Sequence, residues 1–381
     1  MIKNKLFLLA LLVVVFVSTG NLNSLSVKAN DDKLTNFEPA FLNRPNYDGR
    51  IVFSSNARGN NYNLYVADAG GGDLHEITHE PGDEINPSIS PDGNFVAYAQ
   101  NNEGDWNITV MEIDTENRWN LTHSPHNETN PDWSDWDRIA YQSDKYGNWD
   151  IMWKDAFGPE WNGGTSPDME ITNSPQNETN PAWGRYNYAS MIAYVRDGDI
   201  WAFDDNMGQE FRTPASGGGE QVMPLWYPGD DIFPNSRGTA LIYKEKNKPG
   251  LMWSGLDGGN RGPLLKTKDQ NPRNIPVISA SFGLSPETIG FVTKKGEIMA
   301  FNFYDRDNPS MIDVREHRGR IKDMDWGPWG SHGGHGGGFM GMGGGGNRNG
   351  GGGGMMDRMR DMVPGGNNRG GGNNMDNRMM D

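Results

Sequence analysis

Three segments of the sequence share one pattern, and this repeat restricts the chain to an architecture built from similar modules. They read LHEITHEPGDEINPSISPDGNFVAYAQ, WNLTHSPHNETNPDWSDWDRIAYQSD and MEITNSPQNETNPAWGRYNYASMIAYVRD. Each has a short strand pattern ending in Ile-Thr or Leu-Thr, a polar turn, Glu-x-Asn-Pro and then alternating apolar residues. A further strand pattern recurs in NLYVAD, NITVMEI, DIMWKD and DIWAFD. Short alternating runs between Asn, Asp, Gly and Pro predict β-strands, and no helical pattern competes with them.

The length of the repeat follows from the bulky apolar residue of the strand that comes after the proline in most repeats. That residue falls at Phe41, Ile89, Trp133, Trp183, Trp226, Ile278 and Trp326, with spacings of 48, 44, 50, 43, 52 and 48 residues. A four-stranded antiparallel unit of this length is typical of a β-propeller blade. We therefore predict an all-β, six-bladed propeller. Either Phe41 or Trp326 completes a blade begun at the other end of the chain, which closes the ring and removes exposed sheet edges.

The motifs inside the repeat resemble those of a known family. The run Pro-x-Trp-Ser-x-Asp, Ile-Ala-Tyr, a Gly/Asn turn, Asp-Ile and Leu-Thr is similar to the WD40-like repeat of TolB-like proteins. The likeness covers roughly residues 36–329 and is strongest over 50–203. The resemblance implies an exported six-bladed propeller that binds proteins in the cell envelope.

The beginning of the sequence reads as an export signal. A short positive segment precedes Leu6–Val17, a run of 12 apolar residues that is shorter than the roughly 18 needed to cross a bilayer. We predict a signal peptide over 1–29, a linker over 30–35 and the propeller over 36–330. The protein would then be periplasmic or extracellular, with no membrane span after signal cleavage. An uncleaved membrane anchor is the alternative.

The end of the sequence, 331–381, holds 20 Gly and 9 Met in 51 residues. Such a tail has too little apolar surface to offset its chain entropy, so we predict that it is disordered. Thioether sulfur and imidazole suit Cu(I), which gives a metal-binding interpretation. Its candidate ligands are His332, His335, Met340, Met342, Met355, Met356, Met359 and Met362. The other interpretation is a low-complexity linker whose Met residues make weak, adaptable contacts.

Charge and cysteine content exclude several classes of function. The chain has 34 Lys and Arg against 50 Asp and Glu, a net charge of -16, so it does not present the basic surface that binds nucleic acid. Without cysteine there are no disulfides, thiolate nucleophiles or Cys-ligated metals.

A polar pattern recurs just before the strand that we expect to be innermost in each blade. A Glu lies two residues before an Asn in three repeats, and a Glu lies near the matching position in a fourth. The candidate partner-binding residues are therefore Glu84, Asn86, Glu128, Asn130, Glu178, Asn180 and Glu220. Around one mouth of the central channel they would form an acidic funnel that attracts a cation or a basic peptide. The alternative is that Glu and Asn only cap turns.

The string His75-Glu-Ile-Thr-His79 matches the zinc-protease motif, but it falls on a predicted strand. Two residues four apart on a strand lie about 13 Å from each other, at about 3.3 Å per residue, too far to share one zinc ion. We expect no resident cofactor, apart from a cation that an acidic channel could hold.

The sequence thus predicts a monomeric, non-catalytic scaffold that binds another envelope or extracellular protein. A metal-handling protein acting through the tail is one alternative. A propeller enzyme acting on envelope polysaccharide or peptide is the other, but none of the seven His recurs at an inner-strand position.

Overall fold

The structure is a computed structural model. It describes residues 47–102, 104–184, 190–215, 221–227, 240–246, 250–256, 261–264, 276–284, 287–303, 310–312, 314, 317 and 319–328. The predicted signal peptide, linker and tail lie outside the described residues, as does Phe41.

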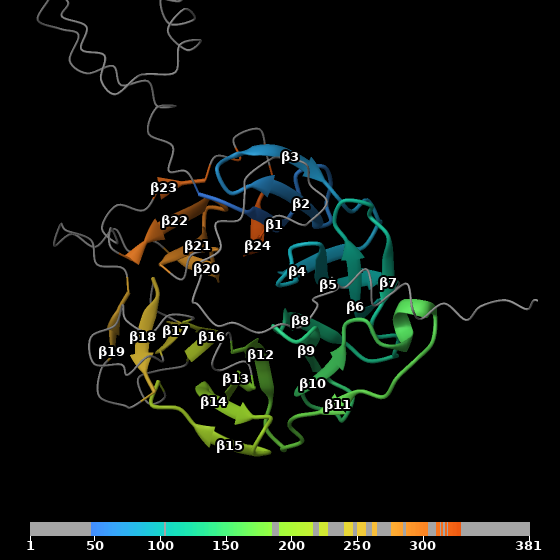
Figure 1. Ribbon diagram of the computed structural model, residues 1–381, viewed down its shortest axis with the longest axis vertical. Helices are drawn as coiled ribbons and strands as arrows, with labels where there is room; N and C mark the ends of the chain where they lie inside the picture. Colours follow the sequence, from blue (N-terminus) through green and yellow to red (C-terminus); the bar gives the residue numbers. More distant parts are fainter. Residues whose placement is uncertain are drawn as a thin grey trace, which may run out of the picture. The chain divides into compact units, whose positions relative to one another are not determined.

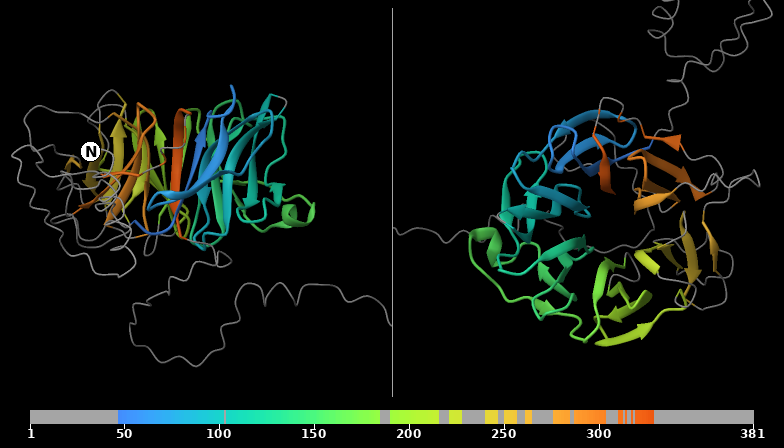
Figure 2. Two further views of the ribbon diagram at one scale, coloured as in Figure 1. Left: turned by 90° about the horizontal axis from the view of Figure 1, so that it is seen from above. Right: turned by 180° about the vertical axis from the view of Figure 1, so that it is seen from behind.

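Six four-stranded antiparallel sheets form the ring, and each is one blade (Figures 1 and 2). Blade 1 contains β24 (Ile321–Gly327), β1 (Arg50–Ser55), β2 (Asn63–Asp68) and β3 (Gly72–Glu76). Blade 2 contains β4 (Asp83–Ile89), β5 (Phe95–Asn102), β6 (Asp105–Glu112) and β7 (Arg118–Asn120). Blade 3 contains β8 (Glu128–Trp133), β9 (Arg138–Ser143), β10 (Asp150–Asp155) and β11 (Met169–Glu170). A 3-10 helix, η1 (Pro159–Asn162), lies between β10 and β11.

The other three blades follow the same order. Blade 4 contains β12 (Glu178–Trp183), β13 (Met191–Arg196), β14 (Asp199–Asp204) and β15 (Gln209–Arg212). Blade 5 contains β16 (Gln221–Trp226), β17 (Ala240–Glu245), β18 (Met252–Gly255) and β19 (Arg261–Pro263). Blade 6 contains β20 (Val277–Phe282), β21 (Thr288–Thr293), β22 (Ile298–Asn302) and β23 (Ser310–Met311). The strand named first in each blade is the innermost, as predicted (Figure 1).

Blade 1 closes the ring by joining the two ends of the repeat region. Its inner strand β24 comes from the C-terminal side and pairs antiparallel with β1, from Arg50 opposite Gly327 to Ser55 opposite Ile321. The predicted closure is therefore confirmed, with Trp326 as the bulky residue of the closing strand. The pairing removes the open edges that an unclosed row of blades would expose.

The bulky inner-strand residues pack between blades. Trp133, Trp183, Trp226 and Trp326 are all buried. In blade 6 the equivalent place belongs to Phe282, the last residue of β20, and not to Ile278 as predicted. Ile278 is instead the extra residue of a bulge, where the pairing with β21 shifts between Val277 and Ser279.

A recurring hydrogen bond joins neighbouring blades beside these bulky residues. The backbone N–H of Trp133 donates to the Ser88 hydroxyl at 3.0 Å, and that of Trp183 donates to the Asp132 carboxylate at 2.5 Å. The same contact recurs from Ile89 to Asp325 and from Trp326 to Ser281. In each pair the acceptor immediately precedes the bulky residue of its own blade. This contact fixes the register of one blade against the next.

The described residues form no helix that is long and apolar enough to cross a membrane.

Candidate functional site

The three recurring glutamates lie inside the blades. Glu84, Glu128 and Glu178 stand at or next to the start of β4, β8 and β12 and are 0%, 3% and 0% exposed. Partner binding by these carboxylates stays a prediction, but the structure gives them almost no surface in the channel.

Hydroxyl groups hold these buried carboxylates in place. Thr78 donates to Glu84 at 3.1 Å, and Ser124 donates to Glu128 at 2.6 Å. Glu178 differs because it also accepts a hydrogen bond from Arg196 Nε at 2.6 Å. The acids therefore act as internal anchors for the polar turns, as the capping alternative proposed, with side-chain hydroxyls as the donors.

Burial changes the ionisation of this set. It raises the pKa of Glu84 to about 8 and also raises the pKa of Glu128. Burial, and then the charge of Glu178, raises the pKa of Asp150 to about 7. In blade 5 the position belongs to Gln221, which is 0% exposed and uncharged. Glu220 lies outside the described residues.

We expect Glu84→Gln to stabilise the protein at high pH. A carboxyl group with a pKa of about 8 in the folded chain and about 4.5 in the unfolded chain lowers stability as pH rises from 4.5 to 8. The amide removes this cost, so the free energy of unfolding should rise by about 2–5 kcal/mol at pH 8.5 and change little at pH 4.5. Urea unfolding at both pH values measures the difference.

The control for this prediction is Glu116→Gln at an exposed turn. It should change the free energy of unfolding by less than about 0.5 kcal/mol at either pH. An equal effect of Glu84→Gln at both pH values would contradict the assignment of a neutral, buried Glu84.

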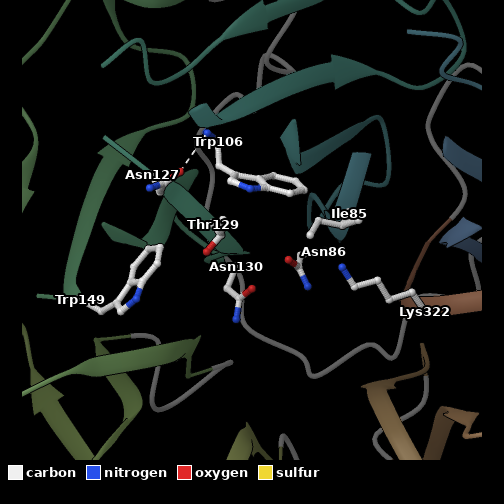
Figure 3. Close-up of a pocket in the computed structure, with 8 residues that line it drawn as sticks. All are labelled: Ile85, Asn86, Trp106, Asn127, Thr129, Asn130, Trp149 and Lys322. Carbon is white, nitrogen blue, oxygen red and sulfur yellow. Dashed lines mark hydrogen bonds between the residues drawn. The ribbon is translucent and has the colours of Figure 1, made fainter. Parts of the chain in front are cut away.

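An open pocket of about 520 Å³ lies near the starts of the inner strands of blades 1, 2 and 3 (Figure 3). In an antiparallel blade the first and third strands start at the same end, so residues at these starts meet there. The pocket is lined by Ile85, Asn86, Trp106, Asn127, Thr129, Asn130, Trp149 and Lys322. We call this pocket the aromatic mouth. The indoles of Trp106 and Trp149 stand on two sides of it.

The aromatic residues of the mouth recur from blade to blade. Trp106 is the second residue of the third strand of blade 2, and Trp149 directly precedes the third strand of blade 3. Their counterpart in blade 1, Tyr62, directly precedes the third strand there but is not part of the pocket lining. Each is half-buried. The backbone carbonyls of Tyr62 and Trp149 accept hydrogen bonds from the N–H of Glu84 and Glu178 in the next blade, both at 2.7 Å. The equivalent carbonyl in blade 4 belongs to Gly198, so the aromatic series ends there.

The asparagines of the predicted site share an unusual backbone conformation. Asn86, Asn130 and Asn180 have positive φ values of 54°, 52° and 54°, which Asn tolerates better than most residues. Each lies where the pairing of its inner strand shifts, and such a bulge redirects a side chain. Figure 3 shows the amides of Asn86 and Asn130 directed into the aromatic mouth. Asn86 also donates from Nδ2 to Asp323 at 3.2 Å.

The structure therefore brings two of the predicted residues, Asn86 and Asn130, together with groups that the sequence analysis missed. These are Trp106, Trp149 and Lys322. A signal was present, because an aromatic residue recurs just before Asn-Leu, Asn-Ile or Asp-Ile in NYNLY, DWNIT and NWDIM. Lys322 had no counterpart in the other repeats to reveal it.

The two motifs that the sequence analysis considered for metal binding are the His75–His79 string and the tail ligands. His75 and Glu76 lie on β3, and the other three residues of the motif, 77–79, follow the strand, so the strand prediction is confirmed for the first two residues only. Among the residues that the structure describes, no group of three or more His, Asp or Glu could hold a metal ion. The tail ligands lie outside the described residues. They are His332, His335, Met340, Met342, Met355, Met356, Met359 and Met362.

The ring and its closing strand define the protein as a six-bladed β-propeller. Its fold is TolB-like, as the resemblance implied. TolB from Acinetobacter baumannii matches with a TM-score of 0.56 and 15% identity, over 74% of this chain and 68% of TolB. At this identity the likeness shows the fold alone.

Two other solved structures share the fold. A chain of a nidogen/laminin complex matches with a TM-score of 0.53 and 8% identity, over 72% of this chain and 97% of that one. Hydrazine synthase from Kuenenia stuttgartiensis matches with a TM-score of 0.54 and 13% identity, over 73% of this chain and 46% of that one. No family model matches the sequence, and no curated protein does.

Proposed function

We propose that this protein is an exported, non-catalytic platform that binds another envelope or extracellular protein at the aromatic mouth. The observation that carries the proposal is the convergence of Trp106, Trp149, Asn86 and Asn130 on one open pocket. Tryptophan is enriched among the residues that dominate binding energy at protein interfaces. Amides add donors and acceptors that fix the orientation of a bound segment.

The ring supports this role because it holds the mouth in a fixed shape. The pocket residues come from the inner and third strands of adjacent blades, which hydrogen bonds and buried bulky residues join together. A site that is ordered before binding loses less conformational entropy when a partner docks.

The chemistry of the lining supports binding without bond breaking. Catalysis by a general acid and base requires titratable groups within hydrogen-bond reach of the substrate. Lys322 is the titratable residue among those that line the pocket. The acids with raised pKa values, Glu84 and Glu128, are buried within the blades.

The proposals of export and of a protein partner are supported by separate observations. The run Leu6–Val17 has the length of a signal-peptide core. A propeller of similar fold also occurs in a nidogen/laminin complex.

The test is capture of a partner by the full chain from a cell-envelope extract of the source organism, followed by calorimetry with the purified partner. Replacing both Trp106 and Trp149 by alanine should weaken binding by about 100-fold or more, because central tryptophans contribute on the order of 2 kcal/mol each. Trp136→Ala is the control. Trp136 is 48% exposed and lies in the turn between β8 and β9, at the other end of blade 3 from Trp149. Unchanged affinity in the double variant would refute the proposed site.

A further inference from the structure

Lys322 occupies a special place in the aromatic mouth. It is the extra residue of a bulge in β24, because Ser55 pairs with Ile321 while Ser54 pairs with Asp323. The bulge directs the exposed Lys322 side chain into the pocket, next to Asn86 (Figure 3). Its ammonium group lies 5.3 Å from the centre of the Tyr62 ring.

Lys322 forms no salt bridge within the part of the chain that the structure describes, although its charge acts on the neighbouring carboxylate of Asp323. The nearest acid in sequence, Asp323, is only 7% exposed and accepts hydrogen bonds from Ser54 and from Asn86 Nδ2. The Asp323 carboxylate is therefore directed into the blade, while the Lys322 ammonium remains accessible in the mouth.

The residues around Lys322 make the mouth selective for an anionic ligand. The other seven lining residues are uncharged, although the whole chain carries a net charge of -16. A cation among indoles in a partly enclosed space attracts an anion more strongly than one on an open surface. The expected acidic funnel would have selected a basic ligand, whereas the lining of the observed mouth carries a positive charge from Lys322.

Resting on the proposed function, we infer that the partner segment in the aromatic mouth carries a carboxylate, from an Asp or Glu side chain or a free C-terminus, and that Lys322 binds it. Asn130, whose amide is also directed into the mouth, then supplies a donor for the second carboxylate oxygen. Trp106 and Trp149 then pack on the apolar or aromatic residues that flank the acid. Lys322 thus determines which segments the mouth accepts.

Selection of random linear peptides on the full chain tests this inference. Peptides displayed on phage are first depleted on the Trp106→Ala, Trp149→Ala double variant, so that those retained depend on the mouth. We expect the retained peptides to be enriched in Asp and Glu over the starting library. Synthetic forms with a free or an amidated C-terminus distinguish a side-chain from a terminal carboxylate.

The affinity of a retained peptide is then measured by fluorescence anisotropy. Lys322→Met should weaken binding about 5- to 10-fold, and Asp→Asn or Glu→Gln in the peptide should have an equal effect. The two changes together should cost little more than either alone, and Lys322→Arg should retain most of the affinity. Lys145→Met, which removes an exposed lysine paired with Asp168 on blade 3, is the control and should change affinity less than twofold.

Two results would contradict different claims. Mouth-dependent peptides without acidic enrichment, or insensitive to Lys322→Met, would overturn the carboxylate inference and leave the proposed binding site intact. If no peptide depended on Trp106 and Trp149, both the binding site and the inference would be wrong. Thermal unfolding of each variant confirms that the ring is folded.

Discussion

Replacing Trp326 by alanine is expected to lower the free energy of unfolding by about 3–5 kcal/mol, the range for a buried tryptophan. Trp326 is 5% exposed and belongs to the core between blades 6 and 1. Its indole N–H donates to the carbonyl of Asp48 at 2.9 Å. Its ring packs edge-on against that of Tyr47, with 5.4 Å between the ring centroids. The substitution therefore weakens the junction where the two ends of the repeat region meet. Urea or thermal unfolding measures the loss.

Glycines in blade 6 show how closely Trp326 is fitted. A Cβ at Gly290 would lie 2.9 Å from the Trp326 ring, and one at Gly283 would lie 3.3 Å from it. The neighbouring chain cannot fill the cavity that alanine leaves without moving backbone. The matched control is Trp136→Ala. The Trp136 side chain is 48% exposed, so this substitution should lower the free energy of unfolding by less than about 1 kcal/mol. Equal losses for the two variants would contradict the closing role of Trp326.

The sequence predicted the ring because each blade repeats a strong local signal. The bulky residue two places after the proline marks the inner strand in blades 2 to 5, at Ile89, Trp133, Trp183 and Trp226. Such a residue can be recognised in the sequence because it fills the same space between blades in each repeat. Closure was predictable for the same reason, since seven bulky positions separated by six intervals leave Phe41 or Trp326 to complete a blade begun at the other end of the chain.

Prediction failed where the repeat loses its markers. In blade 6 the dipeptide Ile275-Pro276 resembles Asn-Pro, but the inner strand begins after it and ends at Phe282. In blade 5 the residue three before Pro224 is Gln221, whereas Glu220, which was predicted only to lie near the matching position, is outside the described residues. Without the Glu-x-Asn-Pro string, small shifts in register cannot be recognised from one sequence.

The candidate site was only half predictable, because a bulge changes which face a residue occupies. Residues two apart on a regular strand share one face, so Glu84 and Asn86 should both have reached the channel. The positive φ at Asn86 breaks this alternation, so that Glu84 is buried in the blade while Asn86 is directed into the aromatic mouth. Local backbone conformation of this kind is not visible in residue spacing alone.

Removing Arg196 is expected to destabilise blade 4 strongly. Arg196 donates from Nε to Glu178 at 2.6 Å and from both Nη atoms to Glu210 at 2.9 and 2.8 Å. Arg196→Met leaves the fully buried Glu178 without its cation, which should cost about 3–5 kcal/mol at pH 8. Urea unfolding measures this loss. The exposed pair of Arg212 and Asp199 in the same blade provides the control, and Arg212→Met should cost less than about 1 kcal/mol.

The dependence on pH and a second substitution identify the cause of the loss. Without Arg196, burial disfavours the charged form of Glu178, as it does for Glu84, whose pKa rises to about 8. An acid with a raised folded-state pKa destabilises the protein more as pH increases, so the deficit of Arg196→Met should be smaller at pH 5 than at pH 8. Adding Glu178→Gln, which recreates the uncharged group that Gln221 supplies in blade 5, should restore part of the stability at pH 8. An equal deficit at both pH values with no recovery in the double variant would mean that lost packing, and not a stranded buried charge, causes the damage.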